Sequence, residues 1–232
     1  VAVGKSALYA LTTGTKNTAV GYHAGAAITT GIGTTFIGYN AGYQSSGQYS
    51  VIIGDRAFDA STDSTSSSNV IIGANAGGAV NSAYSSDNIF IGYDAGFGGS
   101  GRIHSSIAIG RNAMKSTAAN AVTGQIAIGM EALSALTSGD ANLAIGYEAM
   151  KVHTTGGNNI AIGYGAMNDT DAGSTSLGSE SNVFIGVDAG GGTWADAASR
   201  YNVGLGVATL SDALNGADGN VAIGYQTGRY VT

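Results

Sequence analysis

The chain has 232 residues, of which 10% are charged, with a formal net charge of −6 and 39 glycines but no proline and no cysteine. The lack of a concentrated cluster of Lys and Arg argues against nucleic acid and anionic membranes as partners, and no apolar run approaches the roughly 20 residues of a membrane span. Disordered glycine-rich linkers carry few aliphatic residues, whereas 44% of this chain is apolar, so we expect an ordered fold without disulfide bonds.

A short motif recurs from one end of the chain to the other. It begins at Val1–Gly4, and its most regular copy is Ile107–Gly110, which reads I-A-I-G. The motif glycines that follow Gly4 are Gly21, Gly38, Gly54, Gly73, Gly92, Gly110, Gly129, Gly146, Gly163, Gly186, Gly206 and Gly224. They lie 16 to 23 residues apart, and such a period predicts a solenoid. We therefore expect residues 1–232 to form a single repetitive domain, and, because the chain begins inside a repeat, to be a fragment of a longer protein.

Each repeat is numbered here from its glycine, which is position 0. Position −1 is a branched aliphatic residue in every copy, position −3 is one in all copies except those with Thr18 and Thr35, and position −2 is often Ala. Successive side chains of a strand face opposite sides. The pattern therefore predicts a short strand whose side chains at −3 and −1 are buried, while the side chain at −2 faces the other way.

The positions around the strand have fixed preferences too. Position −4 is preferably Asn, as at Asn159 and Asn182, and we expect these side chains to bond from coil to coil as a ladder. The glycine at 0 predicts either a backbone with positive φ or a place too crowded for a Cβ. Position +1 is commonly Tyr, which we expect to stack along the rod, and the small Ala at +3 indicates a close approach of backbones.

Two buried aliphatic side chains per repeat make a thin core, because ordering the rest of each repeat has a large entropic cost. Three chains that each contribute one strand per layer would close around a shared axis. We therefore predict an all-β fold, a parallel β-roll or β-helix solenoid of about thirteen coils, assembled as an elongated homotrimer. With a rise of about 4.8 Å per repeat, the rod would be roughly 60 Å long. An isolated coiled monomer stays an alternative, and the handedness of the coil stays open.

Two copies of the repeat carry a resemblance to known families. Asn159–Met167 reads N-I-A-I-G-Y-G-A-M and Asn182–Gly190 reads N-V-F-I-G-V-D-A-G. These units resemble repeats of bacteriophage tail-fibre proteins, and also the S-V-A-I-G-x-x-A head repeats of trimeric autotransporter adhesins. The adhesin repeats are shorter and continue with an A-x-A-x-G run that is missing here, which favours the phage fibre. Both resemblances imply a trimeric fibre that attaches to a cell surface, commonly through glycans.

The function that follows is a structural and adhesive segment of a phage tail fibre, located on the virion and bound to a host-cell glycan or protein. The alternatives are a head segment of a bacterial surface adhesin and a polysaccharide-cleaving tail spike. Trp194, the only tryptophan, lies with Tyr201 in a polar stretch after the longest repeat. An exposed aromatic ring there could stack on a sugar, so we predict Trp194 and Tyr201 as receptor-binding residues; the other interpretation is that Trp194 packs over its own loop.

Other chemical motifs have simpler structural explanations. The match of Gly96–Gly101 to G-x-G-x-x-G lacks the following helix that a dinucleotide site needs, because the next strand begins at Ile107. Asp169 and Asp171 could offer oxygen ligands to calcium, but loop aspartates are usually solvated. Glu131 and Glu148, at +2 of consecutive repeats, could form the carboxylate pair of a hydrolase, with the pKa of one raised by the other, or could simply face solvent. We predict no catalytic residue, no metal and no cofactor.

Overall fold

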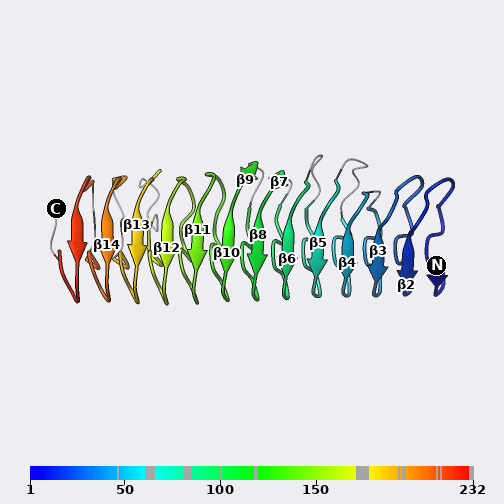
Figure 1. The fold of residues 1–232 in the computed structure, drawn as a ribbon, viewed down its shortest axis with the longest axis horizontal. Helices are drawn as coiled ribbons and strands as arrows, with labels where there is room; N and C mark the ends of the chain where they lie inside the picture. The colour runs from blue at the N-terminus through cyan, green and yellow to red at the C-terminus, as the bar shows by residue number, and fades with distance from the viewer. Residues whose placement is uncertain are drawn as a thin grey trace.

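The computed structural model describes residues 1–45, 47–60, 66–80, 85–99, 101–117, 120–170, 178–192, 194, 197–212, 214 and 216–229. In this part of the chain there is no helix, and the backbone winds as a solenoid whose short strands stack side by side in one direction (Figure 1). The N-terminus and the C-terminus lie at opposite ends of the stack (Figure 1). The predicted all-β, parallel solenoid is thereby confirmed.

The thirteen expected copies of the motif form one thirteen-stranded sheet within the described residues. Its strands are β1 (Ala2–Val3), β2 (Thr18–Val20), β3 (Thr35–Ile37), β4 (Val51–Ile53), β5 (Val70–Ile72), β6 (Ile89–Ile91), β8 (Ile107–Ile109), β10 (Ile126–Ile128), β11 (Leu143–Ile145), β12 (Ile160–Ile162), β13 (Val183–Ile185), β14 (Val203–Leu205) and β15 (Val221–Ile223). A two-stranded sheet of β7 (Ile103–His104) and β9 (Val122–Thr123) lies outside the motif and was not predicted.

The strands pair in a constant register. In β8 and β10, for example, Ala127 is paired with Ala108, and the flanking isoleucines are paired with each other. Equal positions of successive repeats therefore form straight columns along the rod, even though the repeats differ in length. The extra residues of the longer repeats are accommodated between the strands, so that the register is unchanged.

The motif glycine is required for two independent reasons. Gly110 has a φ of +128°, a backbone conformation that residues with a side chain rarely adopt, and a Cβ there would lie 2.6 Å from the carbonyl oxygen of Gly129 in the next coil. The carbonyl oxygen of Gly110 stands in the same way 2.7 Å from a Cβ added to Gly92. Positive φ and crowding thus act together at this column, and both predicted explanations are confirmed.

The asparagines at −4 form the predicted ladder. The main-chain N–H of Asn88 donates to Oδ1 of Asn69 at 3.0 Å, and Nδ2 of Asn88 donates to the carbonyl oxygen of Ile103 at 2.8 Å. Where the repeat has Ser50 instead, its Oγ accepts from the N–H of Asn69 at 3.1 Å. Each side chain therefore satisfies buried backbone groups of the following coil, which would otherwise lack partners.

The strand side chains face the opposite way from the prediction. From β2 to β15 in the main sheet, the central residue at −2 is buried, as at Phe36 and Ala108, whereas the residues at −3 and −1 are half-buried or exposed. The expectation that −3 and −1 form the core is therefore wrong. The side chain at −2 points into the coil, where it is fully buried whether it is Ala108, Ile52 or Phe36, and the side chains at −3 and −1 therefore point away from the interior.

Volume is exchanged between positions −2 and +4 in several coils of the core. Where −2 is a phenylalanine, as at Phe90 or Phe184, position +4 of the same repeat is glycine, and a Cβ at Gly190 would lie 2.8 Å from Cδ1 of Phe184. Where −2 is Ala161, position +4 is the buried Met167. In these coils the two positions fill the same space; other coils depart from the exchange, since Ala19 occurs with Gly25 and the buried Ile52 with the buried Phe58. Buried side chains beyond the motif enlarge the core: Ile28, Val80, Ile103, Leu136, Trp194 and Leu214.

Candidate interaction face

The outward-facing side of the main sheet is an apolar surface. It consists of the two columns at −3 and −1, which hold only Val, Ile, Leu and Thr, and the adjoining column at +1, which is mostly Tyr and other apolar residues but includes Lys5, Asp55 and Arg111; we call these three columns the outer strand face. Val20 and Ile37 are each 38% exposed and Ile185 is 40% exposed. Branched aliphatic residues that are half-buried or exposed at every level of a stack are unusual on a soluble surface, where apolar residues are normally scattered singly.

The column at +1 extends this face with aromatic rings. Tyr22 and Tyr39 stack with ring centroids 5.4 Å apart and an interplanar angle of 8°, and Tyr147 and Tyr164 stack at 5.2 Å and 11°. The predicted stacking of tyrosines is confirmed for these two pairs. The rings stay partly exposed, with Tyr164 at 55%, so they widen the apolar surface along the rod.

The size of the outer strand face has a direct consequence. Thirteen strands spaced by about 4.8 Å, with a width of about four residues at 3.3 Å each, give an area on the order of 750 Å². A typical soluble monomer leaves at most about 300–600 Å² in its largest apolar patch, whereas a stable interface covers about 800 Å² on each partner. The face therefore has the dimensions and the chemistry of one side of an interface.

The two residues predicted to bind a receptor are not brought together on one surface. Trp194 is fully buried and packs against Phe184 with ring centroids 5.7 Å apart in an edge-on arrangement. The prediction that Trp194 offers an exposed ring is wrong, because the apolar space at the end of this coil is filled by the indole. Tyr201 is 59% exposed at position −5, just before β14, and its receptor role stays a prediction.

The carboxylates at +2 form an ion-pair cluster. Nζ of Lys151 lies 2.7 Å from Oε2 of Glu131 and 3.0 Å from Oε1 of Glu148. The hydrogen bond from Lys151 holds the pKa of Glu131 below its ordinary value, against a smaller opposing effect of desolvation. A general acid in glycoside hydrolysis needs a raised pKa. The expectation that neighbouring carboxylates raise the pKa is therefore wrong for Glu131.

The remaining motifs are structural in the described part of the chain. Gly96 and Gly98 belong to a loop that is followed by β7, while Ser100 of the G-x-G-x-x-G match lies outside the described residues. Asp171, one of the two loop aspartates, also lies outside them. The described residues contain no group of three or more His, Cys, Asp or Glu side chains arranged to hold a metal ion, and no helix long and apolar enough to cross a membrane.

The outer strand face is the candidate interaction surface that the sequence did not predict. The repeated I-A-I-G motif predicts a strand with two different faces but does not specify which face points inward. The reciprocal volumes at −2 and +4 carry that information, because only residues that share an interior must compensate for one another. Comparison of the chain with protein-family models, with curated proteins and with solved structures finds no match.

Proposed function

We propose that this chain is a segment of a homotrimeric fibre, in which three parallel copies pack their outer strand faces around a common axis. The observation that carries the proposal is the outer strand face itself: two columns along the whole sheet, in constant register, that are aliphatic except at Thr18 and Thr35. A threefold axis along the rod would place the same strand of all three copies at the same height. The −3 column of one copy would then meet the −1 column of the next, which removes the aliphatic side chains from water.

The reason for association differs from the one that the sequence suggested. Each coil has a continuous core of its own, built from −2, +3 and +4 together with residues such as Ile28 and Leu136. Sister chains are therefore not needed to complete the interior. They are needed to cover the aliphatic side chains at −3 and −1, which point away from the interior.

The role that suits such a rod is to attach a larger particle to a cell surface, as a segment of a phage tail fibre. This proposal rests on the resemblance of repeats such as Asn159–Met167 to phage tail-fibre repeats, together with the proposed trimer. A head segment of a bacterial surface adhesin is the alternative. A polysaccharide-cleaving spike has less support, because Lys151 binds both carboxylates of the Glu131–Glu148 pair.

Attachment is tested by applying the fluorescently labelled chain to a panel of intact bacterial strains and, in parallel, to immobilised extracellular-matrix proteins. The phage-fibre role predicts saturable binding to a subset of the bacterial strains. Binding to the matrix proteins alone would favour the adhesin. The absence of binding to either surface, by a chain whose assembly has been verified, would contradict an adhesive role for this segment.

A further inference from the structure

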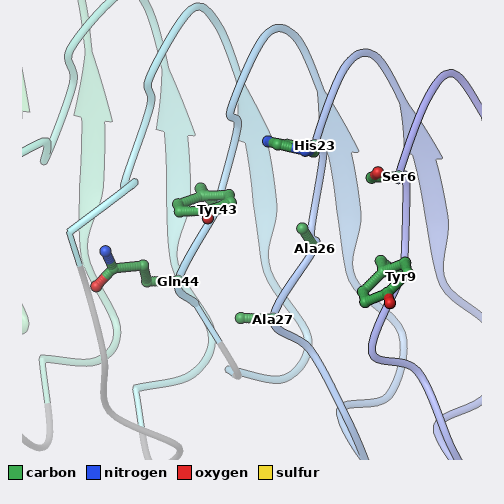
Figure 2. Close-up of a pocket in the computed structure, with 7 residues that line it drawn as sticks. All are labelled: Ser6, Tyr9, His23, Ala26, Ala27, Tyr43 and Gln44. Atoms are coloured by element: carbon green, nitrogen blue, oxygen red, sulfur yellow. The ribbon is translucent and has the colours of Figure 1, made fainter.

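Position +5 of the first three repeats forms an aromatic slot. Tyr9 and Tyr43 occupy this position in the first and third repeats, and Ala26 occupies it in the second. Because the columns are straight, the two tyrosines lie two coils apart, about 10 Å, with only the methyl group of Ala26 between them. Figure 2 shows the two rings on either side of Ala26 and Ala27, with His23 at one end. We call this feature the Tyr9–Tyr43 slot.

The slot has the size and the rigidity of a ligand site. Its volume is about 410 Å³, within the range of pockets that bind small molecules. The floor is held by main-chain hydrogen bonds to both neighbouring coils: the N–H of Ala10 donates to the carbonyl oxygen of Ala26 at 3.0 Å, and the N–H of Ala27 donates to that of Tyr43 at 3.1 Å. The floor is therefore preorganised, which lowers the entropic cost of binding.

The chemistry of the slot combines aromatic surfaces with uncharged polar groups. Tyr9 is 82% exposed and Tyr43 is 37% exposed, so ring surface is available on both sides. Ser6, Gln44 and the imidazole of His23 supply donors and acceptors at the rim, and neither a carboxylate nor an ammonium or guanidinium group lines the slot. His23 stacks on Tyr43 with ring centroids 5.4 Å apart, which supports that ring from one side.

The rest of the +5 column has no second slot of this kind among the described residues. Phe97 is the other aromatic residue at +5, but its ring covers the neighbouring glycine, and a Cβ at Gly78 would lie 3.2 Å from Cε2 of Phe97. Elsewhere the column holds no aromatic ring. The alternation Tyr–Ala–Tyr is thus a local feature and is not required by the repeat.

We infer that the Tyr9–Tyr43 slot binds a single uncharged pyranose ring of a surface polysaccharide; this inference names the ligand class of the proposed attachment function and rests on it. A pyranose has an apolar C–H face that stacks on tyrosine and a rim of hydroxyls that matches Ser6, Gln44 and His23. An anionic sugar has no cationic partner in the lining. In Figure 2 the strands lie behind the segments that carry the slot, so covering the outer strand face leaves the slot open.

The test uses saturation-transfer difference NMR with the methyl glycosides of glucose, galactose, mannose and N-acetylglucosamine. The methyl glycoside of N-acetylneuraminic acid, with its carboxylate free, serves as the anionic probe. We expect saturation transfer to the ring protons of at least one neutral glycoside and none to the anionic probe. The expected Kd is in the millimolar range, which corresponds to about 4 kcal/mol of binding free energy. The absence of transfer to every neutral glycoside, or transfer to the anionic probe alone, would overturn the inference.

Variants locate the binding. Ala26→Tyr fills the slot and should weaken binding at least tenfold, and it should fold, because Tyr already occupies this position in both neighbouring repeats. Ala26→Ser keeps the slot open and should bind as the unchanged chain does, as should Tyr49→Ala, which removes an exposed ring elsewhere (63% exposed). Equal binding by Ala26→Tyr and the unchanged chain would contradict the assignment. Light scattering on the same samples separates this outcome from a failure of the proposed trimer.

Discussion

Asn182 and Asn202 lie one coil apart, and Oδ1 of Asn182 accepts two hydrogen bonds from Asn202, from its main-chain N–H at 3.0 Å and from its Nδ2 at 3.1 Å. Nδ2 of Asn182 in turn donates to the carbonyl oxygen of Ser199 at 2.9 Å. One buried amide therefore satisfies groups of the next coil that have no access to water. The same arrangement recurs along the rod, and it joins coils whose lengths differ.

Replacing Asn182 by Ala should lower the free energy of unfolding by about 2–4 kcal/mol, because it leaves the N–H of Asn202 and the carbonyl of Ser199 without partners in the core. Asn182→Ser is the matched control, since Ser50 and Ser106 use Oγ to accept the same main-chain N–H. It should cost roughly half as much. Urea unfolding and amide hydrogen exchange at Asn202 measure the difference; equal exchange rates in both variants would contradict the role of the side chain.

The glycine column allows steric crowding to be separated from backbone strain. Gly110→Ala introduces a Cβ 2.6 Å from the carbonyl oxygen of Gly129 at a φ of +128°. Gly224 has a similar φ of +122°, but the nearest atom to its Cβ is Cγ2 of Thr227 at 3.4 Å. We expect Gly224→Ala to cost about 1–3 kcal/mol from strain alone and Gly110→Ala to cost more. Thermal unfolding of both variants checks this, and equal costs would remove crowding as a cause.

The exchange of volume in the core predicts a double-mutant effect. Phe184→Ala should cost about 3–5 kcal/mol by opening a cavity, and Gly190→Met alone should clash with the ring of Phe184. The combination recreates the Ala161–Met167 pair, in which Met167 has the same left-handed backbone as Gly190, with a φ of +51°. The double variant should therefore be more stable than the sum of the single effects predicts, by at least 1 kcal/mol. Strict additivity in urea unfolding would contradict a shared space.

The ion-pair cluster predicts how the pKa of Glu131 responds to Lys151. In Lys151→Met the pKa of Glu131 should rise toward its ordinary value, because the hydrogen bond and the charge of Lys151 are lost while the weaker lowering effects of Asn112 and Arg111 remain. The pKa of Glu131 is lower in the folded chain than in the unfolded chain, so its pairing with Lys151 stabilises the fold at neutral pH. This stabilisation is lost as the pH falls through the folded-state pKa of Glu131. It is small, because solvent screens the pair. Carboxyl NMR titration measures the shift. Lys115→Met, which removes the partner of Asp94, should leave Glu131 unchanged.

Much of the fold could be predicted from the sequence because it is encoded by local repetition. Alternating β-branched residues before a fixed glycine specify a strand and a corner, and the asparagine at −4 specifies its own hydrogen bonds to the next coil. The period then orders the strands without any long-range reasoning. For the main sheet, neither the positions of the strands nor their parallel stacking required knowledge of tertiary packing, whereas the small sheet of β7 and β9 has no signal in the repeat.

What could not be predicted depends on the cross-section of the coil. Ile107 and Ile109 are more apolar than Ala108, so hydrophobicity alone places them inside, yet the strand turns its central residue inward and Ala108 is the one that is fully buried. Trp194 lies among small residues and Thr193 and Asp196 in the sequence, with no apolar pattern around it, but its ring fills space beside Phe184 that only the assembled coil creates. The Tyr9–Tyr43 slot depends on three residues that are far apart in the chain and are aligned by the register.

The assembly of the outer strand face is measured most directly by light scattering, on the unchanged chain and on Ile162→Asp. We expect a mass of about three times 22.9 kDa for the unchanged chain. We expect Ile162→Asp to have the monomer mass and an unchanged circular dichroism spectrum, because a carboxylate at this half-buried outward position would be desolvated in the trimer. Thr13→Asp, which adds the same charge at an exposed loop position, should stay trimeric. A folded 22.9 kDa monomer for the unchanged chain would contradict the fibre.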